Sequence, residues 1–248
     1  MFYPSGDKIF HDVYGPEITG IRRETYDFLQ DEIIEEVLTN KIRENTRLRI
    51  SAFGINSKAY IEIYNQLMFL LKYYKKILEG ISALTIEDKS RLTYVSMGNE
   101  DDPEVIRICE RYEKGIGDSS RGVYFPDTCE IWLDPNQMVS MEELQDRNHL
   151  NYRLLGSAGF TLLHEFAHHV YRNQLSTYTK EQIFKVYKSF PRYNKRYLGG
   201  SEEYFCDMFA SIRFGHPNRF TDAERALMKA VKGSSTFNMY VYEDWSVS

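Results

Sequence analysis

The segment that most constrains the fold of this chain is residues 164–168, because it places two histidines and a glutamate within about one helical turn. It reads HEFAH. Residues four positions apart lie on one face of a helix, so the imidazoles of His164 and His168 can reach a single cation. Glu165 lies beside that face, where its carboxylate can take a proton from a metal-bound water. The pattern predicts a helix that carries a hydrolytic metal site.

The sequence around this segment predicts a helix from Leu154 to about Arg172. Apolar residues lie on nearly every side of it, so we expect a central helix. Two imidazoles on a buried helix need partners, because an unsatisfied buried polar group is costly. A metal ion would satisfy them.

A carboxylate further along the chain is the candidate third ligand. A catalytic zinc ion usually has three protein ligands and an open position for water. Glu203 follows the second histidine by 35 residues. On a helix that begins near Ser201, Asp207 shares the face of Glu203, and it can accept a hydrogen bond from the far nitrogen of a ligand histidine. His164 is the expected recipient.

Three nearby residues have alternative interpretations. Glu202 is a rival ligand to Glu203, and either carboxylate is also favoured at a helix N-terminus without binding a metal. Cys206 can be read as a thiolate ligand, but a small buried packing residue is the preferred interpretation. His169 points away from the two candidate ligands, so we expect a packed or surface histidine. The remaining histidines have no neighbours at ligand spacing: His11, His149 and His216.

The composition limits the classes of partner. The chain has 248 residues, 42% of them hydrophobic, and a formal net charge of −5, which is typical of a globular protein. Its basic residues are spread out, so no nucleic-acid partner is expected. The 19 tyrosines indicate packing or, less simply, an aromatic-lined peptide groove.

The sequence carries no evident targeting signal. Residues 1–7 have no basic and apolar signal-peptide pattern, and the longest apolar stretch, 67–71, is too short to span a bilayer. The 3 cysteines form no disulfide framework. We expect a soluble chain, cytoplasmic as written, with export by another route or trimming of a precursor left open.

The pattern of residues along the chain predicts an α+β fold. Residues 1–90 are expected to be helical, with amphipathic helices around 33–42 and 57–78. A strand, a short helix and a loop should follow, at Thr93–Met97, Glu104–Tyr112 and Gly115–Ser120. Gly122–Phe125 and Glu130–Asp134 then predict a β-hairpin. The predicted organisation is a single catalytic domain in three parts: 1–90, a core at 91–216, and a C-terminal helix and tail at 217–248.

Two motifs of this chain resemble those of gluzincin zinc metallopeptidases. Residues 163–168 read LHEFAH and residues 202–210 read EEYFCDMFA. Together they are similar to the catalytic domain of anthrax lethal factor and its relatives, which include the secreted Pro-Pro endopeptidases. Cys206 replaces the usual alanine of that element. The resemblance extends over about residues 122–214.

The resemblance implies a zincin-like fold, one Zn²⁺ ion, and an endopeptidase, in some relatives a toxin, that acts on extended protein or peptide substrates. It implies His164, His168 and Glu203 as ligands and a tyrosine that donates to the transition-state oxyanion. Tyr197 is the best match for that tyrosine, with Tyr193 as the alternative. In these families an edge strand beside the active-site helix pairs with substrate, which implies Gly122, Val123, Tyr124 and Phe125.

Two other functions remain open at this stage. An intracellular regulatory peptidase of the ImmA/IrrE type also combines HExxH with a downstream acidic element. A binding module could retain the zincin fold and metal without cleaving, although it would not need Glu165.

Overall fold

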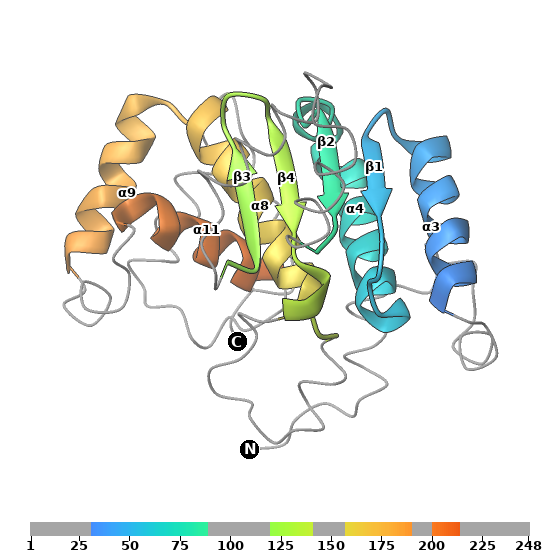
Figure 1. The fold of residues 1–248 in the computed structure, drawn as a ribbon. Coiled ribbons are helices and arrows are strands. Elements are labelled where there is room, and N and C mark those ends of the chain that lie inside the picture. The colour runs from blue at the N-terminus through green and yellow to red at the C-terminus, as the bar shows by residue number, and fades with distance from the viewer. Residues whose placement is uncertain (1–30, 89–119, 141–156, 190–199, 214–248) are drawn as a thin grey trace, which may run out of the picture. The chain divides into compact units, whose positions relative to one another are not determined.

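A computed structural model gives the fold and describes residues 31–88, 120–140, 157–189 and 200–213 (Figure 1). The chain divides into two compact units, Met1–Leu162 and Leu163–Ser248, and the boundary falls inside helix α8, Ala158–Asn173. The first unit contains helices α3 (Asp31–Asn45) and α4 (Ser57–Leu78), four strands and the short 3₁₀ helix η1 (Pro135–Gln137). The second contains α9 (Thr177–Ser189) and α11 (Gly200–Arg213).

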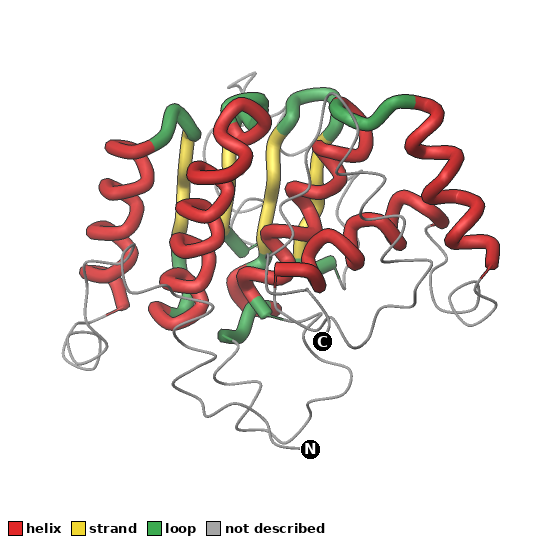
Figure 2. The backbone as a smooth tube through the Cα atoms, turned by 180° about the vertical axis from the view of Figure 1, so that it is seen from behind, coloured by secondary structure: helices red, strands yellow, loops and turns green. Residues whose placement is uncertain are grey.

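The first unit is built on a small mixed sheet. Its strands are β1 (Arg49–Ala52), β2 (Ala83–Ile86), β3 (Gly122–Phe125) and β4 (Glu130–Leu133), in the order β1-β2-β4-β3. Strands β1, β2 and β4 run parallel to one another, and β3 pairs antiparallel with β4. Helices α3 and α4 both lie on one face of the sheet (Figures 1 and 2). These helices and this small mixed sheet confirm the predicted α+β class.

The burial of β4 explains its place inside the sheet. Ile131, Trp132 and Leu133 are at most 3% exposed, and such a continuous apolar run is typical of a strand covered on both faces. The indole nitrogen of Trp132 donates a hydrogen bond of 2.9 Å to the carbonyl of Glu87. The predicted hairpin is confirmed, with β4 ending at Leu133 instead of at Asp134.

The prediction that residues 1–90 are helical is wrong in part. Helices α3 and α4 lie where the sequence predicted helices, but β1 and β2 lie after them and supply two of the four strands. Each of these strands has only four residues, too few for a two-residue period to stand out beside long helical patterns. The prediction of a single catalytic domain stays a prediction.

Helices α3 and α4 pack through the predicted apolar stripe. Ile34, Leu38 and Ile42 of α3 are at most 2% exposed. The hydroxyls of Thr39 and Tyr60 share a buried hydrogen bond of 2.6 Å, which satisfies both groups inside the contact between α3 and α4.

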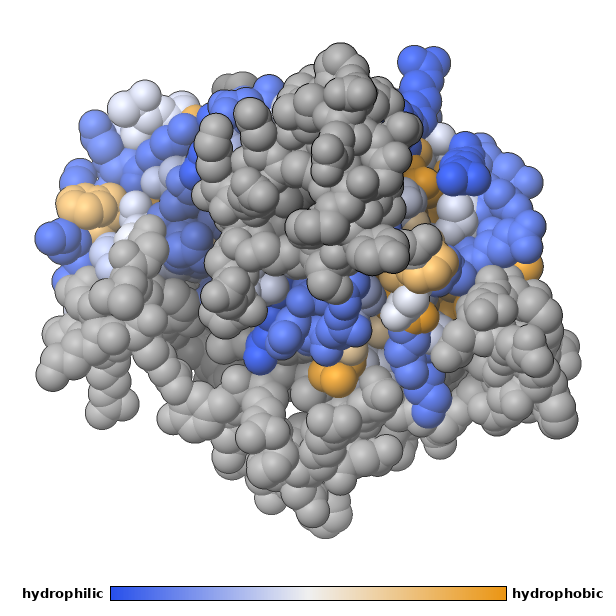
Figure 3. All heavy atoms as spheres, viewed as in Figure 1, coloured by the Kyte–Doolittle hydropathy of each residue, from blue (hydrophilic) through white to orange (hydrophobic). Residues whose placement is uncertain are grey.

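Several predicted segments lie outside the described residues. These are the strand Thr93–Met97, the helix Glu104–Tyr112, most of the loop Gly115–Ser120, and the C-terminal part 217–248. Among the helices that the structure describes, none is long and apolar enough to cross a membrane. On the face shown in Figure 3, the surface over α9 is mainly hydrophilic.

Each backbone N–H in the first turn of α8 has a partner, although helix starts usually leave four such groups unsatisfied. Ala158 N–H donates to the carbonyl of Val139 at 3.0 Å, and Gly159 N–H donates to Oε1 of Glu62 at 2.9 Å. Phe160 N–H donates to the hydroxyl of Ser157 at 3.1 Å. Thr161 N–H makes the first intrahelical bond, also to Ser157. These bonds fix the residue at which the helix begins.

Gly159 is required by the close approach of α4. A Cβ atom at this position would lie 2.8 Å from Oε1 and 2.9 Å from Cγ of Glu62, closer than side-chain atoms normally pack. It would also lie 3.0 Å from Cγ of Gln66. Both neighbours are 0% exposed, so neither can move aside into solvent.

Gly159→Ala should therefore lower the free energy of unfolding. Overpacking a tight core commonly costs about 1–3 kcal/mol, and the better helix propensity of alanine returns up to about 1 kcal/mol. We expect a net loss of about 1–2 kcal/mol in denaturant unfolding. The same change in a Glu62→Ala background is the control, because the two closest contacts are then absent and the penalty should be smaller. An equal penalty in both backgrounds would contradict the contact.

Candidate metal centre

The second unit brings α8 and α11 together through aromatic rings. The ring centroids of Phe166 and Phe209 lie 6.0 Å apart, and those of Tyr171 and Phe205 lie 5.7 Å apart. Cys206 and Ala210 of α11 are 0% exposed, as expected of small residues that let helices approach. The predicted start of this helix near Ser201 agrees with its observed start at Gly200.

Two residues interrupt the burial of α8. From Ser157 to Val170, every residue is buried except His164 and His168. Their side chains are 17% and 12% exposed. The predicted central helix is confirmed, and both imidazoles can be reached from solvent.

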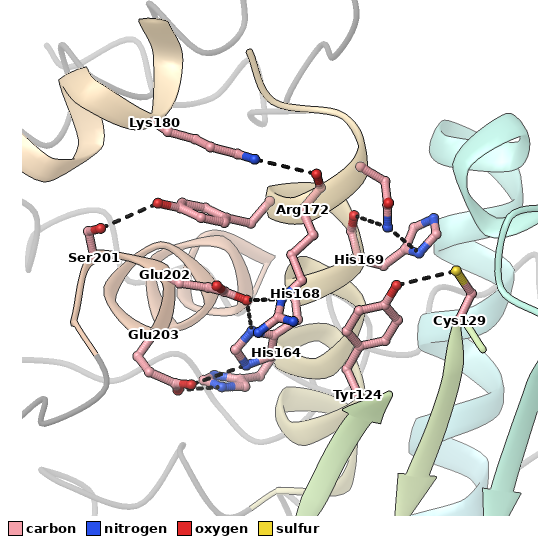
Figure 4. Close-up of polar contacts among 12 residues, drawn as sticks. Tyr124, Cys129, His164, His168, His169, Arg172, Lys180, Ser201, Glu202 and Glu203 are labelled. Atoms are coloured by element: carbon pink, nitrogen blue, oxygen red, sulfur yellow. Dashed lines mark hydrogen bonds and ion pairs between the residues drawn. The ribbon is translucent and has the colours of Figure 1, made fainter. Parts of the chain in front are cut away.

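The two imidazoles share one carboxylate partner (Figure 4). Nε2 of His164 lies 3.1 Å from Oε2 of Glu203, and Nε2 of His168 lies 3.4 Å from Oε1 of the same residue. Two donor atoms bound to a tetrahedral zinc ion at 2.0–2.1 Å lie about 3.3 Å from each other. Both nitrogen–oxygen distances are therefore close to the one that two ligands of a zinc ion require.

Each imidazole also has a carboxylate at its other nitrogen. Nδ1 of His164 lies 2.8 Å from Oδ1 of Asp207, so the predicted hydrogen bond is present. Nδ1 of His168 lies 2.8 Å from Oε1 of Glu202. Glu202, which the sequence suggested as a rival ligand, instead contacts the nitrogen that faces away from Glu203. Such bonds fix which ring nitrogen is available to a metal.

Arg172 completes this arrangement and was not among the predicted site residues. Its Nε donates to Oε1 of Glu202 at 2.6 Å. Arg172 follows His168 by four residues, so the helical spacing that relates the two histidines also extends to it. That spacing is the feature of the sequence from which Arg172 could have been predicted to lie beside the two histidines.

The charges of the site shift several pKa values. Burial would lower the pKa of His164, but hydrogen bonds to Asp207 and Glu203 and the charge of Glu165 raise it to about 10. The hydrogen bond with His164 lowers the pKa of Glu203 against the effect of burial. Burial would raise the pKa of Glu202, but hydrogen bonds from His168 and Arg172 lower it overall. Without a metal, Asp207, Glu203 and Glu165 therefore hold a proton on His164.

Cys206 lies close enough to the histidines to be considered as a ligand. Ligand atoms of His164, His168 and Cys206 all lie within 4.8 Å of one another. Burial and the charges of four nearby carboxylates raise the pKa of its thiol well above the usual range. We favour Glu203 as the third ligand, because both of its oxygens already lie near Nε2 atoms and its pKa is lowered.

The neighbouring His169 is a packed residue, as predicted. It is 3% exposed, and burial lowers its pKa. Nδ2 of Asn173 lies 3.2 Å from its Nδ1. Glu165, the predicted proton acceptor, is 6% exposed, and its charge acts on both His164 and Cys206.

The remaining predicted site residues lie outside the described residues or in the first unit. Tyr197 and Tyr193 lie outside the described residues, as do His11, His149 and His216. The predicted substrate strand is β3, in the first unit, where Gly122 and Val123 are partly exposed and Tyr124 and Phe125 are buried. Among the described strands β3 pairs only with β4, so it is an edge strand.

The chain was compared with protein-family models, with curated proteins and with solved structures, and none of them matches it.

Asp207→Asn should lower the pKa of His164 in the metal-free protein, because the charged hydrogen-bond acceptor is lost. In the parent protein the folded-state pKa of about 10 lies above the ordinary 6.5. His164 therefore stabilises the metal-free fold below about pH 6.5, and this contribution is lost as the pH rises through 10.

Imidazole ¹⁵N chemical shifts, followed against pH in the presence of a chelator, measure this change. The exposed turn residue Asp127 provides the matched control, and Asp127→Asn should leave the titration of His164 unchanged. A His164 titration that is the same in Asp207→Asn and in the parent protein would contradict the assigned hydrogen bond.

Proposed function

We propose that this chain is a zinc-dependent endopeptidase with a zincin-like fold. The observation that supports this most strongly is the convergence of three candidate ligands: both Nε2 atoms face Glu203, at 3.1 and 3.4 Å. Two imidazoles and one carboxylate are the donor set of many catalytic zinc sites, and they leave one position open. When bound, zinc supplies a Lewis acid that activates water and polarises a substrate carbonyl.

Three residues of the chain would then have separate roles in orienting a ligand, transferring a proton and stabilising the oxyanion. Asp207 holds the ring of His164 by its Nδ1 atom, so that Nε2 is directed towards the ion. Glu165 follows that histidine directly and is the proposed general base, which takes a proton from water and passes it to the leaving amine. Tyr197 remains the proposed donor to the oxyanion.

An extended polypeptide is the proposed substrate. The edge strand β3 has no partner strand on one side among the described strands, and an extended peptide can pair with such an edge through its backbone. Backbone pairing gives affinity for any extended sequence, while side-chain pockets set the preference.

Glu165→Gln should remove hydrolysis and leave metal binding intact. The amide cannot accept the proton, and general-base catalysis commonly contributes about 10²–10⁴ in rate. Cleavage of a diverse peptide library, mapped by mass spectrometry, should fall at least about a hundredfold. Zinc content should stay at one ion per chain.

Two controls complete that experiment. Glu181→Gln, which makes the same change at an exposed residue of α9, should cleave as the parent does. A chelator should stop cleavage by the parent protein and by Glu181→Gln. Undiminished turnover by Glu165→Gln would overturn the proposed mechanism.

A second candidate function is a metal-binding module without catalysis. It is favoured by one observation, the nearness of Cys206 to both histidines, because mixed cysteine and histidine ligands are typical of closed structural zinc sites. If the Cys206 thiolate joined the other three ligands, no position would remain for water.

Substituting the two competing ligands separates these functions. We expect Glu203→Ala to weaken zinc binding strongly and Cys206→Ala to leave it nearly unchanged, because the buried thiol stays protonated. In the cobalt-substituted protein, a thiolate-to-metal charge-transfer band should be absent. A strong band that disappears in Cys206→Ala would favour the closed site.

A further inference from the structure

In the candidate metal centre, two carboxylates contact the histidines at the ring nitrogens that face away from Glu203. Asp207 lies 2.8 Å from Nδ1 of His164. Glu202 lies at the same distance from Nδ1 of His168. Both histidines turn Nε2 towards Glu203 (Figure 4).

We propose that Glu202 is a positioning residue of the metal centre and that Arg172 holds it in place. Glu202 accepts the hydrogen bond of Nδ1 of His168, so that Nε2 is the nitrogen available to the ion. The bond also fixes the orientation of the imidazole ring. This inference rests on the proposed function, because it requires that His168 is a ligand.

The contacts of Glu202 explain why it does not take the place of Glu203. Its Oε1 atom accepts from two donors, Nδ1 of His168 at 2.8 Å and Nε of Arg172 at 2.6 Å. Both are hydrogen bonds to a charged carboxylate, which are stronger than neutral ones. Turning Oε1 towards a metal ion would break both bonds.

The arrangement also follows from the way in which the two helices face each other. His164, His168 and Arg172 are spaced by four residues and share one face of α8. Glu202 and Glu203 are adjacent in the first turn of α11, where the helix dipole favours negative charge. Adjacent residues on a helix point in directions about 100° apart. One glutamate can therefore reach the Nε2 atoms while the other reaches Nδ1 and the arginine.

Zinc affinity is the readout that separates positioning from a merely structural ion pair. Glu202→Ala should weaken Zn²⁺ binding about 10–100-fold, as loss of such a partner to a ligand histidine commonly does. Glu202→Gln should weaken it less, because its carbonyl oxygen can still accept from Nδ1. The measurement is competition between the full-length protein and a chromophoric chelator for Zn²⁺ alone.

Arg172 gives a second and independent test. Arg172→Met keeps most of the side-chain length and should weaken zinc binding in the same direction, but less than Glu202→Ala. The double variant with Glu202→Ala should bind zinc no more weakly than Glu202→Ala alone, because the arginine acts through the glutamate. Additive losses would show that Arg172 acts by a separate route and would overturn that part of the proposal.

Controls distinguish this inference from the proposed function. Glu181→Ala removes an exposed carboxylate from α9 and should not change zinc affinity. If Glu203→Ala and His168→Ala weaken binding while both Glu202 variants bind as the parent does, the positioning role is wrong and the metal site stands. If none of these changes weakens zinc binding, the proposed function fails as well. Should Glu202→Ala fail to fold, Glu202→Gln and Arg172→Met still decide the question.

Discussion

A buried helix that carries two imidazoles is stable only if the ring nitrogens have partners, and the second unit is arranged around that requirement. Helix α8 is buried from Ser157 to Val170 except at His164 and His168. Three acidic residues of α11 contact the four ring nitrogens of these histidines. The aromatic contacts between the two helices set the distance across which those carboxylates reach. The packing of α8 against α11 therefore also determines the geometry of the candidate site.

The beginning of α8 is fixed by a different set of interactions. Glu62 and Ser157 accept hydrogen bonds from its first turn, and Gly159 lets α4 approach closely enough for the first of these bonds. Because a helix repeats every 3.6 residues, fixing where it begins also fixes the direction of every later side chain. A shift of one residue would turn each histidine by about 100°.

The parts of the structure that could be predicted are those determined by local spacing. The helix around His164 and His168, and the face shared by Glu203 and Asp207, follow from a spacing of four residues. The role of Glu202 could not be predicted, because it depends on which rotamer reaches which nitrogen after two helices have packed. The strands β1 and β2 were missed for another reason. Their neighbours in the sheet are distant in sequence, so pairing stabilises segments that carry little local pattern.

The burial of Cys206 has a consequence for the chemistry that this centre can tolerate. A thiol reacts with oxidants and electrophiles mainly as the thiolate, and both burial and the surrounding carboxylates oppose its ionisation. A cysteine so near two imidazoles would ordinarily expose a metal site to sulfenic acid formation or to alkylation. Here the side chain is 0% exposed and its thiol pKa is raised, so we expect Cys206 to behave as a small apolar group that reacts slowly with oxidants and electrophiles.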